Sequence, residues 1–166
     1  MDRRAIIRYF ANTLKFDISF IKEKYLERAF CVNFYELKKQ EGTDNMQLAT
    51  NENKGNMPLA LVGEKAFHLI KFSEMYSASF PVEHFLGDHK KDDDQLAAKL
   101  CDKLELFQFA YIQVNDEIKD EFEGNNGLQK KSQLFFALIG AMYMSIEENN
   151  QCLIEIKRFI NKFVHK

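Results

Sequence analysis

The side chains that could carry chemistry in this chain are mainly acids on helical segments. Glu64 and His68 are four residues apart, so a helix would place them on one face, where such a pair could hold a metal ion. A solvated or capped glutamate and a hydrogen-bonded core histidine are the plainer interpretations. Two acidic runs are typical of solvated loops and helix starts but could supply a substitute metal site: Asp92, Asp93 and Asp94, then Asp116, Glu117, Asp120, Glu121 and Glu123.

The cysteines and histidines do not have the spacing of a zinc site or a disulfide framework. The three cysteines, Cys31, Cys101 and Cys152, are odd in number and far apart. They indicate reduced thiols in a reducing compartment. None of the four histidines pairs with a cysteine or with another histidine at a zinc-binding spacing. Zinc chemistry is therefore not expected.

Composition limits the possible classes of protein. A chain of 166 residues with 46% hydrophobic and 29% charged residues is typical of one globular domain. The formal net charge of -2 argues against a protein that coats nucleic acid by bulk charge, but leaves a local basic patch open. We see no bilayer-spanning run and no secretory signal, so we expect a cytoplasmic protein with no membrane partner. The basic, amphipathic N-terminus leaves an organelle open as the alternative.

Helical periodicity dominates the sequence and predicts a single all-α domain. We expect Asp17 or Ser19 to cap the second long helix, Asp93 or Asp94 to cap the helix over 96–112, and that helix to bend near Asp102. No strand alternation is convincing. The predicted helices cover residues 3–16, 20–31, 33–40, 58–76, 96–112, 127–144 and 149–164, and the predicted loops cover 41–56, 85–95 and 116–126.

Two of the predicted helices carry a glycine in the same kind of apolar run. Gly63 lies in ALVGEKAF and Gly140 lies in ALIGAMY. A glycine inside a helix costs about 1 kcal/mol relative to alanine, so its presence indicates close backbone approach or chance. Because the run occurs twice, we predict that the two helices cross at their glycines. Phe135 and Phe136 are adjacent in the second helix and must point in different directions.

These segments resemble the motifs of the ribonuclease III endonuclease-domain family. That family has a signature helix of the form ERLEFLGD and a later helix of the form AD-x-FEALIGA-x-Y-L-D. Here MPLALVGE (57–64) falls on the first motif and SQLFFALIGAMYMS (132–145) on the second. The resemblance extends in order over nearly the whole chain. It implies one ribonuclease III-like helical domain over residues 1–166, with no double-stranded-RNA-binding domain.

Members of that family cut double-stranded RNA with Mg²⁺, held by four carboxylates on these two helices. The corresponding positions here are Ala60, Glu64, Gln133 and Phe136. Only Glu64 is an acid, so it is the one candidate for a catalytic or metal-binding role. An alanine cannot bind the ion, a glutamine is a weaker ligand, and a phenylalanine is incompatible with a hydrated Mg²⁺. The resemblance therefore implies a degenerate site with no cofactor, or Mg²⁺ or Mn²⁺ if activity persists.

Three functional hypotheses follow from the resemblance and the composition. The first is a catalytically degenerate ribonuclease III-like scaffold, associated with RNA or ribonucleoprotein in RNA processing or ribosome assembly. The second is a divergent but active endoribonuclease on double-stranded RNA, and the third is a helical protein-interaction module without RNA. The apolar residues around the 58–76 helix predict a dimer, with itself or with another ribonuclease III-like chain. Candidate RNA contacts are two lysine pairs: Lys38 with Lys39, and Lys130 with Lys131.

Overall fold

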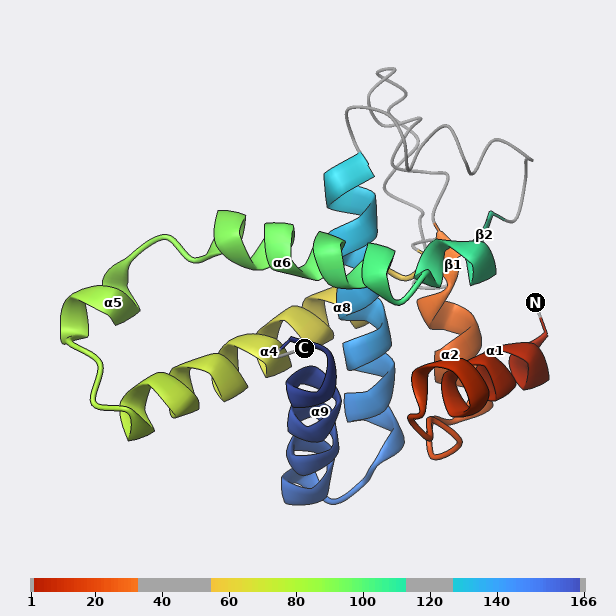
Figure 1. Cartoon of the computed structure of the whole chain (residues 1–166), viewed down its shortest axis with the longest axis horizontal. Helices are drawn as coiled ribbons and strands as arrows, with labels where there is room; N and C mark the ends of the chain where they lie inside the picture. Colours follow the sequence, from red (N-terminus) through yellow and green to blue (C-terminus); the bar gives the residue numbers. More distant parts are fainter. Residues whose placement is uncertain (1, 33–54, 113–126, 165–166) are drawn as a thin grey trace.

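The computed structural model describes residues 2–32, 55–112 and 127–164 as an all-helical fold (Figure 1). Its elements in chain order are α1 (Arg3–Tyr9), the π-helical turn η1 (Phe10–Leu14), α2 (Glu23–Ala29), β1 (Cys31–Val32), α4 (Met57–Ser77), α5 (Val82–Leu86), α6 (Lys90–Lys103), the 3₁₀ turn η4 (Leu106–Phe109), β2 (Tyr111–Ile112), α8 (Gly127–Ser145) and α9 (Asn149–Val164). The expected short helix at 33–40 and most of the expected loops at 41–56 and 116–126 lie outside the described residues.

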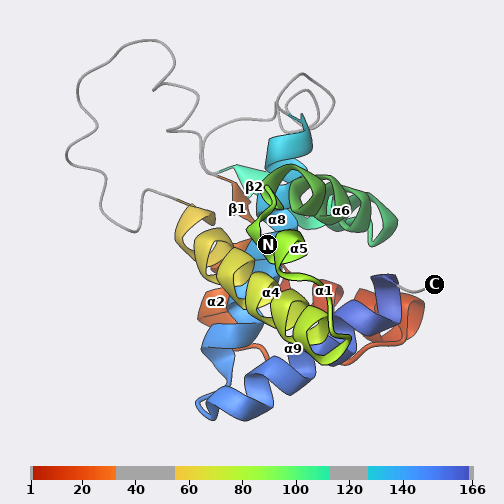
Figure 2. The same cartoon turned by 90° about the vertical axis from the view of Figure 1, so that its left-hand side faces the viewer.

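Helix α8 is the centre of the fold. Its side chains are buried along most of its length, and α4, α6, α2 and α9 all pack against it. A helix that is apolar on all sides is stable only when other elements cover it. Figures 1 and 2 show α4 and α6 crossing α8, while α9 runs beside its C-terminal half.

Phe135 and Phe136 pack against different helices, as their adjacency predicts. The Phe135 ring lies 6.4 Å from the Phe159 ring of α9, whereas the Phe136 ring lies 5.6 Å from the Phe67 ring of α4. Both phenylalanines are almost fully buried. One side chain therefore anchors α9 to α8 and the next anchors α4.

The longest predicted helices are confirmed. Helix α4 begins at Met57 with Pro58 in its first turn, where the missing N–H breaks no helical hydrogen bond. Helices α8 and α9 span the predicted ranges to within a residue. Within the described residues, no helix combines the length and the apolar composition that crossing a bilayer would need.

The expectations for the segment around residues 85–112 are wrong in three respects. Residues 85–95 do not form a loop, because α5 ends at Leu86 and α6 already begins at Lys90. Asp93 and Asp94 therefore lie inside α6 and do not cap it. The predicted helix over 96–112 does not continue beyond the expected bend: α6 ends at Lys103, one residue after Asp102, and the chain turns at Glu105, whose left-handed backbone has φ 52°.

Two further differences lie near the N-terminus. The first predicted helix changes to π-helical geometry at Phe10 and ends at Lys15, which adopts a left-handed backbone with φ 56°. Asp17 accepts a hydrogen bond from the Ser19 backbone N–H, so neither residue caps α2, which begins after Lys22. A short parallel pair, Cys31–Val32 with Tyr111–Ile112, also forms where no strand was expected.

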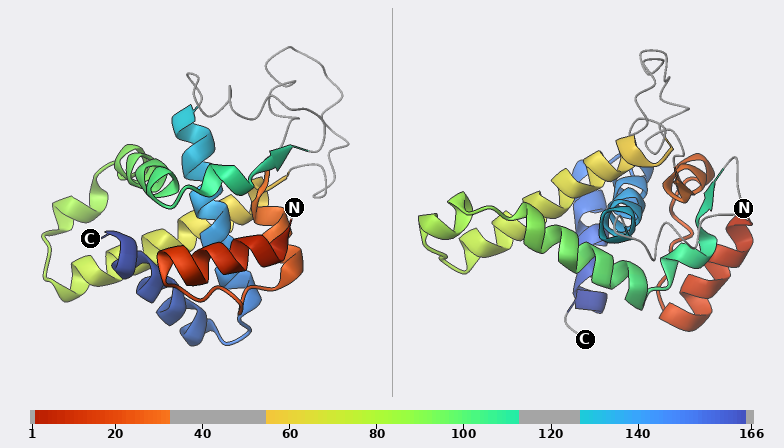
Figure 3. Two further views of the ribbon diagram at one scale, coloured as in Figure 1. Left: turned by 45° about the vertical axis from the view of Figure 1, so that its right-hand side comes forward. Right: turned by 90° about the horizontal axis from the view of Figure 1, so that it is seen from above.

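One side of the molecule is an arm formed by the C-terminal part of α4, the short α5 and the start of α6. Figure 3 shows α5 at the far end of this arm, away from α8. None of the five residues of α5 is buried. Where the arm meets the body, a polar cluster holds α4 and α6 together. In this cluster the Asp93 carboxylate of α6 lies 2.7 Å from the Lys71 ammonium and 2.6 Å from His68 Nε2, both on α4.

Candidate functional site

The glycines of α4 and α8 lie at the point where the two helices cross. A Cβ atom built on Gly140 would stand 1.9 Å from the backbone oxygen of Leu59, and one built on Gly63 would stand 1.8 Å from the backbone oxygen of Phe136. Real Cβ atoms are not found at such distances from backbone atoms. The predicted crossing is therefore confirmed, and it requires a residue without a side chain on each helix.

This crossing brings Ala60, Glu64, Gln133 and Phe136 together. All four line one pocket of about 360 Å³, which Leu61, Ser132, Lys90 and Asp94 also line. Glu64 lies on α4 one turn after Ala60, and Phe136 lies on α8 about one turn after Gln133. The two pairs face each other because the glycines allow the backbones to approach.

The only acid among the four is already paired with a cation. The Glu64 carboxylate lies 3.8 Å from the Lys90 ammonium, which also lies 3.5 Å from the Asp94 carboxylate. The Glu64 side chain is mostly covered, so of the two plainer interpretations, a solvated or a capped glutamate, the solvated one is wrong. Asp94 is the one acid of the 92–94 run that reaches this pocket, with Lys90 between it and Glu64.

The other three positions contribute packing and a neutral hydrogen bond. Phe136 is 3% exposed, and its ring packs on Phe67. The Gln133 side-chain amide donates to Asn56 Oδ1 at 2.8 Å, and Asn56 in turn donates to the Ala29 carbonyl at 3.0 Å. Gln133 thus links α8 to the start of α4 and the end of α2, and Ala60 is buried beside it.

These residues do not fit a magnesium site of the kind that the resemblance implies. Mg²⁺ requires oxygen ligands in near-octahedral geometry and retains several of its waters. Here an aromatic ring and a methyl group occupy two of the four positions, and an ammonium stands next to the remaining acid. Among the described residues, no group of three or more His, Cys, Asp or Glu side chains is placed to share a metal ion.

The other candidate residues lie apart from this pocket or outside the described residues. His68 Nε2 lies 2.6 Å from the Asp93 carboxylate, so this side chain is directed to Asp93 and is not paired with Glu64 around a metal. Asp93 itself is buried, so the expectation that its run is solvated is wrong for this residue. The acids between Asp116 and Glu123 lie in the part of the chain that the structure does not describe.

The structure describes one of the two candidate RNA-binding lysine pairs and all three cysteines. Lys130 is only 6% exposed, and the Lys131 ammonium lies 2.8 Å from Asp102, so this pair does not form an open RNA-binding surface. Lys38 and Lys39 are outside the described residues. All three cysteines are buried free thiols. Burial raises the pKa of the Cys101 thiol to about 12, which makes it a poor nucleophile at neutral pH.

The sequence did not predict the roles of three residues of the site. Asn56 accepts a hydrogen bond from Gln133, and Lys90 lies between the carboxylates of Glu64 and Asp94. Asn56 closes a predicted polar loop, and Lys90 lies in a charged run, so neither has a local signal that distinguishes it from a solvated residue. Comparison of the chain with models of protein families, with curated protein sequences and with solved structures finds no match. Membership of the ribonuclease III family therefore stays a proposal.

Proposed function

We propose that this chain is a ribonuclease III-like protein that has lost its metal chemistry. In this proposal it acts as a dimerising scaffold associated with RNA or ribonucleoprotein, in RNA processing or ribosome assembly. The observation that carries the proposal is the pocket at the α4–α8 crossing. Positions that the two sequence motifs define separately meet there, and their side chains are a methyl group, an ion-paired glutamate, a hydrogen-bonded amide and a buried ring.

The contacts within this pocket favour a scaffold over a divergent nuclease. An active site built around Glu64 would need a cation to displace Lys90 and would need further oxygen ligands. Phe136 and Ala60 provide none, and Gln133, whose side-chain N–H donates to Asn56, offers only a neutral carbonyl oxygen. The side chains at this crossing are instead those that hold helices together, which is the role that a structural subunit requires.

The dimer part of the proposal is supported by the outer face of α4. Three large apolar residues lie along it, with exposed fractions of 56% for Leu61, 52% for Leu69 and 81% for Tyr76, and the exposed Lys65 lies between the two leucines. The opposite face of α4, including Phe67 and Ile70, is buried against the core. An exposed apolar stripe on a helix that is also buried on its other face is typical of a subunit interface.

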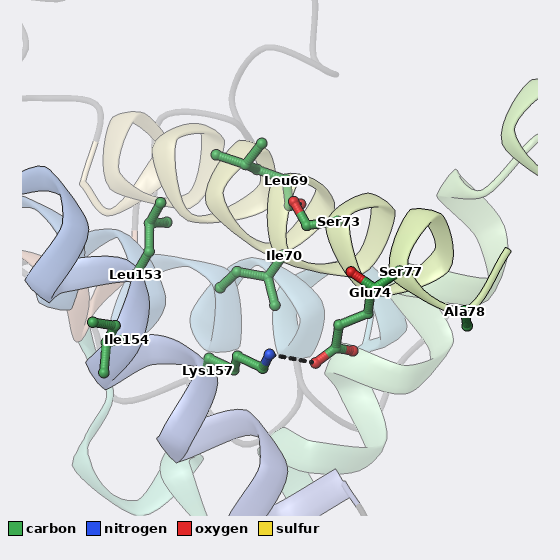
Figure 4. Close-up of a pocket in the computed structure, with 9 residues that line it drawn as sticks. All are labelled: Leu69, Ile70, Ser73, Glu74, Ser77, Ala78, Leu153, Ile154 and Lys157. Atoms are coloured by element: carbon green, nitrogen blue, oxygen red, sulfur yellow. Dashed lines mark hydrogen bonds and ion pairs between the residues drawn. The ribbon is translucent and has the colours of Figure 1, made fainter.

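A groove beside this stripe extends the same surface. Figure 4 shows Leu69 on α4 facing Leu153 and Ile154 on α9 across the groove. Its volume is about 490 Å³, and the Glu74–Lys157 ion pair at 3.7 Å crosses it. A second subunit could bury apolar area on both helices at once, which an isolated exposed leucine would not offer.

We expect Leu69→Glu to convert the dimer to a monomer, because it places a charge at the middle of the apolar stripe. Analytical ultracentrifugation of the wild type should give twice the 19.5 kDa chain mass, and the variant should give the chain mass. A loss of more than tenfold in dimer affinity is expected from burying an unpaired carboxylate. Met144→Glu is the matched control, since Met144 is also an exposed apolar residue but lies on α8. A monomeric wild type would contradict this part of the proposal.

A further inference from the structure

Helix α1 carries three of the five arginines in the chain. Residues 3–16 contain four basic residues and no acidic one, although the whole chain has a formal net charge of -2. Figure 3 shows α1 along the outside of the body, and five of the residues between 4 and 12 are exposed. The positive charge of this segment is therefore local, and part of it lies on an accessible surface.

The two sides of α1 have different roles. Ile6 and Phe10 are fully buried in the core, and the Arg3 guanidinium donates to a backbone carbonyl at 3.3 Å, so this side holds the helix against the body. Arg4 and Arg8 are both exposed, and their spacing of four residues places them together on the outer side. The fold therefore fixes the helix while two guanidinium groups face the solvent.

The outer side of α1 presents hydrogen-bond donors with no bulky side chain between them. Arg4, Arg8 and Asn12 follow one another at intervals of about one turn, and Asn12 lies in η1. The other exposed residues on this side are Ala5 and Ala11, which leave room for a ligand to approach the helix. A guanidinium group can donate to two oxygens of one phosphate, so this arrangement is suited to a row of phosphates.

The two exposed arginines work against the stability of the helix on which they lie. Arg4 is in the first turn of α1, where the helix dipole disfavours a positive charge, and that turn has no acidic side chain. Arg4 and Arg8 are also like charges at i and i+4, which repel each other. In the part of the chain that the structure describes, neither guanidinium group is paired with an acid. An anionic ligand explains them better than a structural role does.

Two acids that contact this segment are engaged elsewhere. The Asp2 carboxylate caps α1 by accepting a hydrogen bond from the Arg4 backbone N–H at 3.0 Å. The Glu105 carboxylate accepts from the Tyr9 hydroxyl at 3.0 Å. The helical twist of about 100° per residue turns Tyr9 away from Arg8, so Glu105 lies at a different side of the helix. Both guanidinium groups therefore remain available to a ligand.

An RNA backbone fits this surface better than an anionic membrane does. A helix that lies on a bilayer buries its apolar face among the lipids. In α1 that face includes Ile6 and Phe10, which are already buried in the core of the protein. Only the charged side is left for a ligand, and contacts between arginine and phosphate are the kind that position RNA without reading its sequence.

We propose that the α1 face formed by Arg4, Arg8 and Asn12 binds the phosphate backbone of RNA. This rests on the proposed function, in which the chain associates with RNA, and it adds the surface through which the contact is made. The two arginines bind neighbouring phosphates of one strand, and the Asn12 amide donates to the same strand. The lysine pairs that the sequence suggested are not needed for this contact.

The test is fluorescence anisotropy with a short fluorescein-labelled RNA hairpin at several salt concentrations. Wild type is compared with the double variant Arg4→Gln/Arg8→Gln and with Lys91→Gln/Lys99→Gln, which removes the same two charges from exposed positions of α6. Two lost phosphate contacts should reduce the slope of log affinity against log salt by about 2. Binding at ~0.1 M salt should weaken about tenfold. The α6 variant should bind within about twofold of wild type, because only the net charge changes.

The melting temperature distinguishes a binding role from a structural one. Arg4→Gln/Arg8→Gln should melt at the temperature of wild type or above it. The reason is that the change removes a charge that opposes the helix dipole and a repulsion between like charges. A clearly lower melting temperature would show that the arginines stabilise the fold, and it would contradict the proposal.

The binding results separate this proposal from the proposed function. If Arg4→Gln/Arg8→Gln binds the hairpin as tightly as wild type, α1 is the wrong surface, while RNA association stands. If the α6 variant loses as much affinity as the α1 variant, the binding is diffuse and the assignment to α1 fails. If wild type binds neither the hairpin nor a single strand, RNA association fails as well. Binding to anionic phospholipid vesicles without binding to RNA would also overturn the assignment.

Discussion

Gly140→Ala is expected to lower the free energy of unfolding by about 3 kcal/mol or more. The added methyl group would stand 1.9 Å from the Leu59 backbone oxygen, and neither α4 nor α8 can move without disturbing the rest of the core. Gly63→Ala should have a similar effect, because its methyl group would meet the Phe136 backbone oxygen. For a chain of this size the loss corresponds to a fall in melting temperature of roughly 6–12 °C, which differential scanning calorimetry would detect.

Gly87→Ala is the matched control for this experiment. Its new methyl group would have no neighbouring atom nearer than 4.0 Å, and the Gly87 backbone has φ -66°, which alanine adopts without strain. The substitution should leave stability unchanged or raise it by about 0.5 kcal/mol. If Gly140→Ala were as stable as Gly87→Ala, the close crossing of α4 and α8 would be wrong, and so would the pocket that depends on it.

Phe136→Ala is expected to cost about 3 kcal/mol of stability, measured by urea unfolding. The ring is buried between α8 and α4, so its removal leaves a cavity beside Phe67. Glu64→Gln at the facing position should cost less than about 1 kcal/mol, because it loses only a long ion pair to a largely exposed lysine. In a working metal site, by contrast, the side chains at both positions would serve the ion and contribute less to packing.

The comparison of these two variants distinguishes a core from an active site. A large loss for Phe136→Ala with a small loss for Glu64→Gln supports the conversion of the site into packing. If Phe136→Ala were stabilising, the ring would be a strained occupant of a cavity made for something else. Removing functional residues often raises stability, so this result would reopen the question of a bound ligand at the crossing.

The features that the sequence predicted well are those with a local physical cause. A glycine inside a helix is costly wherever it occurs, so two of them in matching apolar runs predict a crossing without knowledge of the fold. Adjacent phenylalanines on a helix necessarily face different directions, and Phe135 and Phe136 do so. The all-helical class and the limits of α8 and α9 follow from periodicity in the same way.

The features that the sequence could not predict depend on partners far along the chain. The run around Asp93 has the composition of a solvated loop, yet Asp93 is buried because Lys71 and His68 reach it from α4. Lys130 belongs to a basic pair, but the position of α8 in the core buries it.

The pairing of Lys90 with Glu64 has the same origin. Lys90 begins a helix that was expected to start several residues later, so no spacing argument could connect it to α4. Its ammonium changes the interpretation of Glu64 from a surviving metal ligand to one half of an ion pair. That contact, together with the ring of Phe136, is the main physical reason for proposing a scaffold over a nuclease.

The proposed loss of metal chemistry is tested most directly by incubating long double-stranded RNA with the purified chain in Mg²⁺ and in Mn²⁺, beside Glu64→Gln. We expect no cleavage by either protein, even at high protein concentration, because the positions around the crossing cannot hold the ions that the reaction needs. Metal-dependent cleavage by the wild type that is lost in Glu64→Gln would contradict this account. It would mean that Lys90 yields to a metal ion and that Glu64 serves a rebuilt active site.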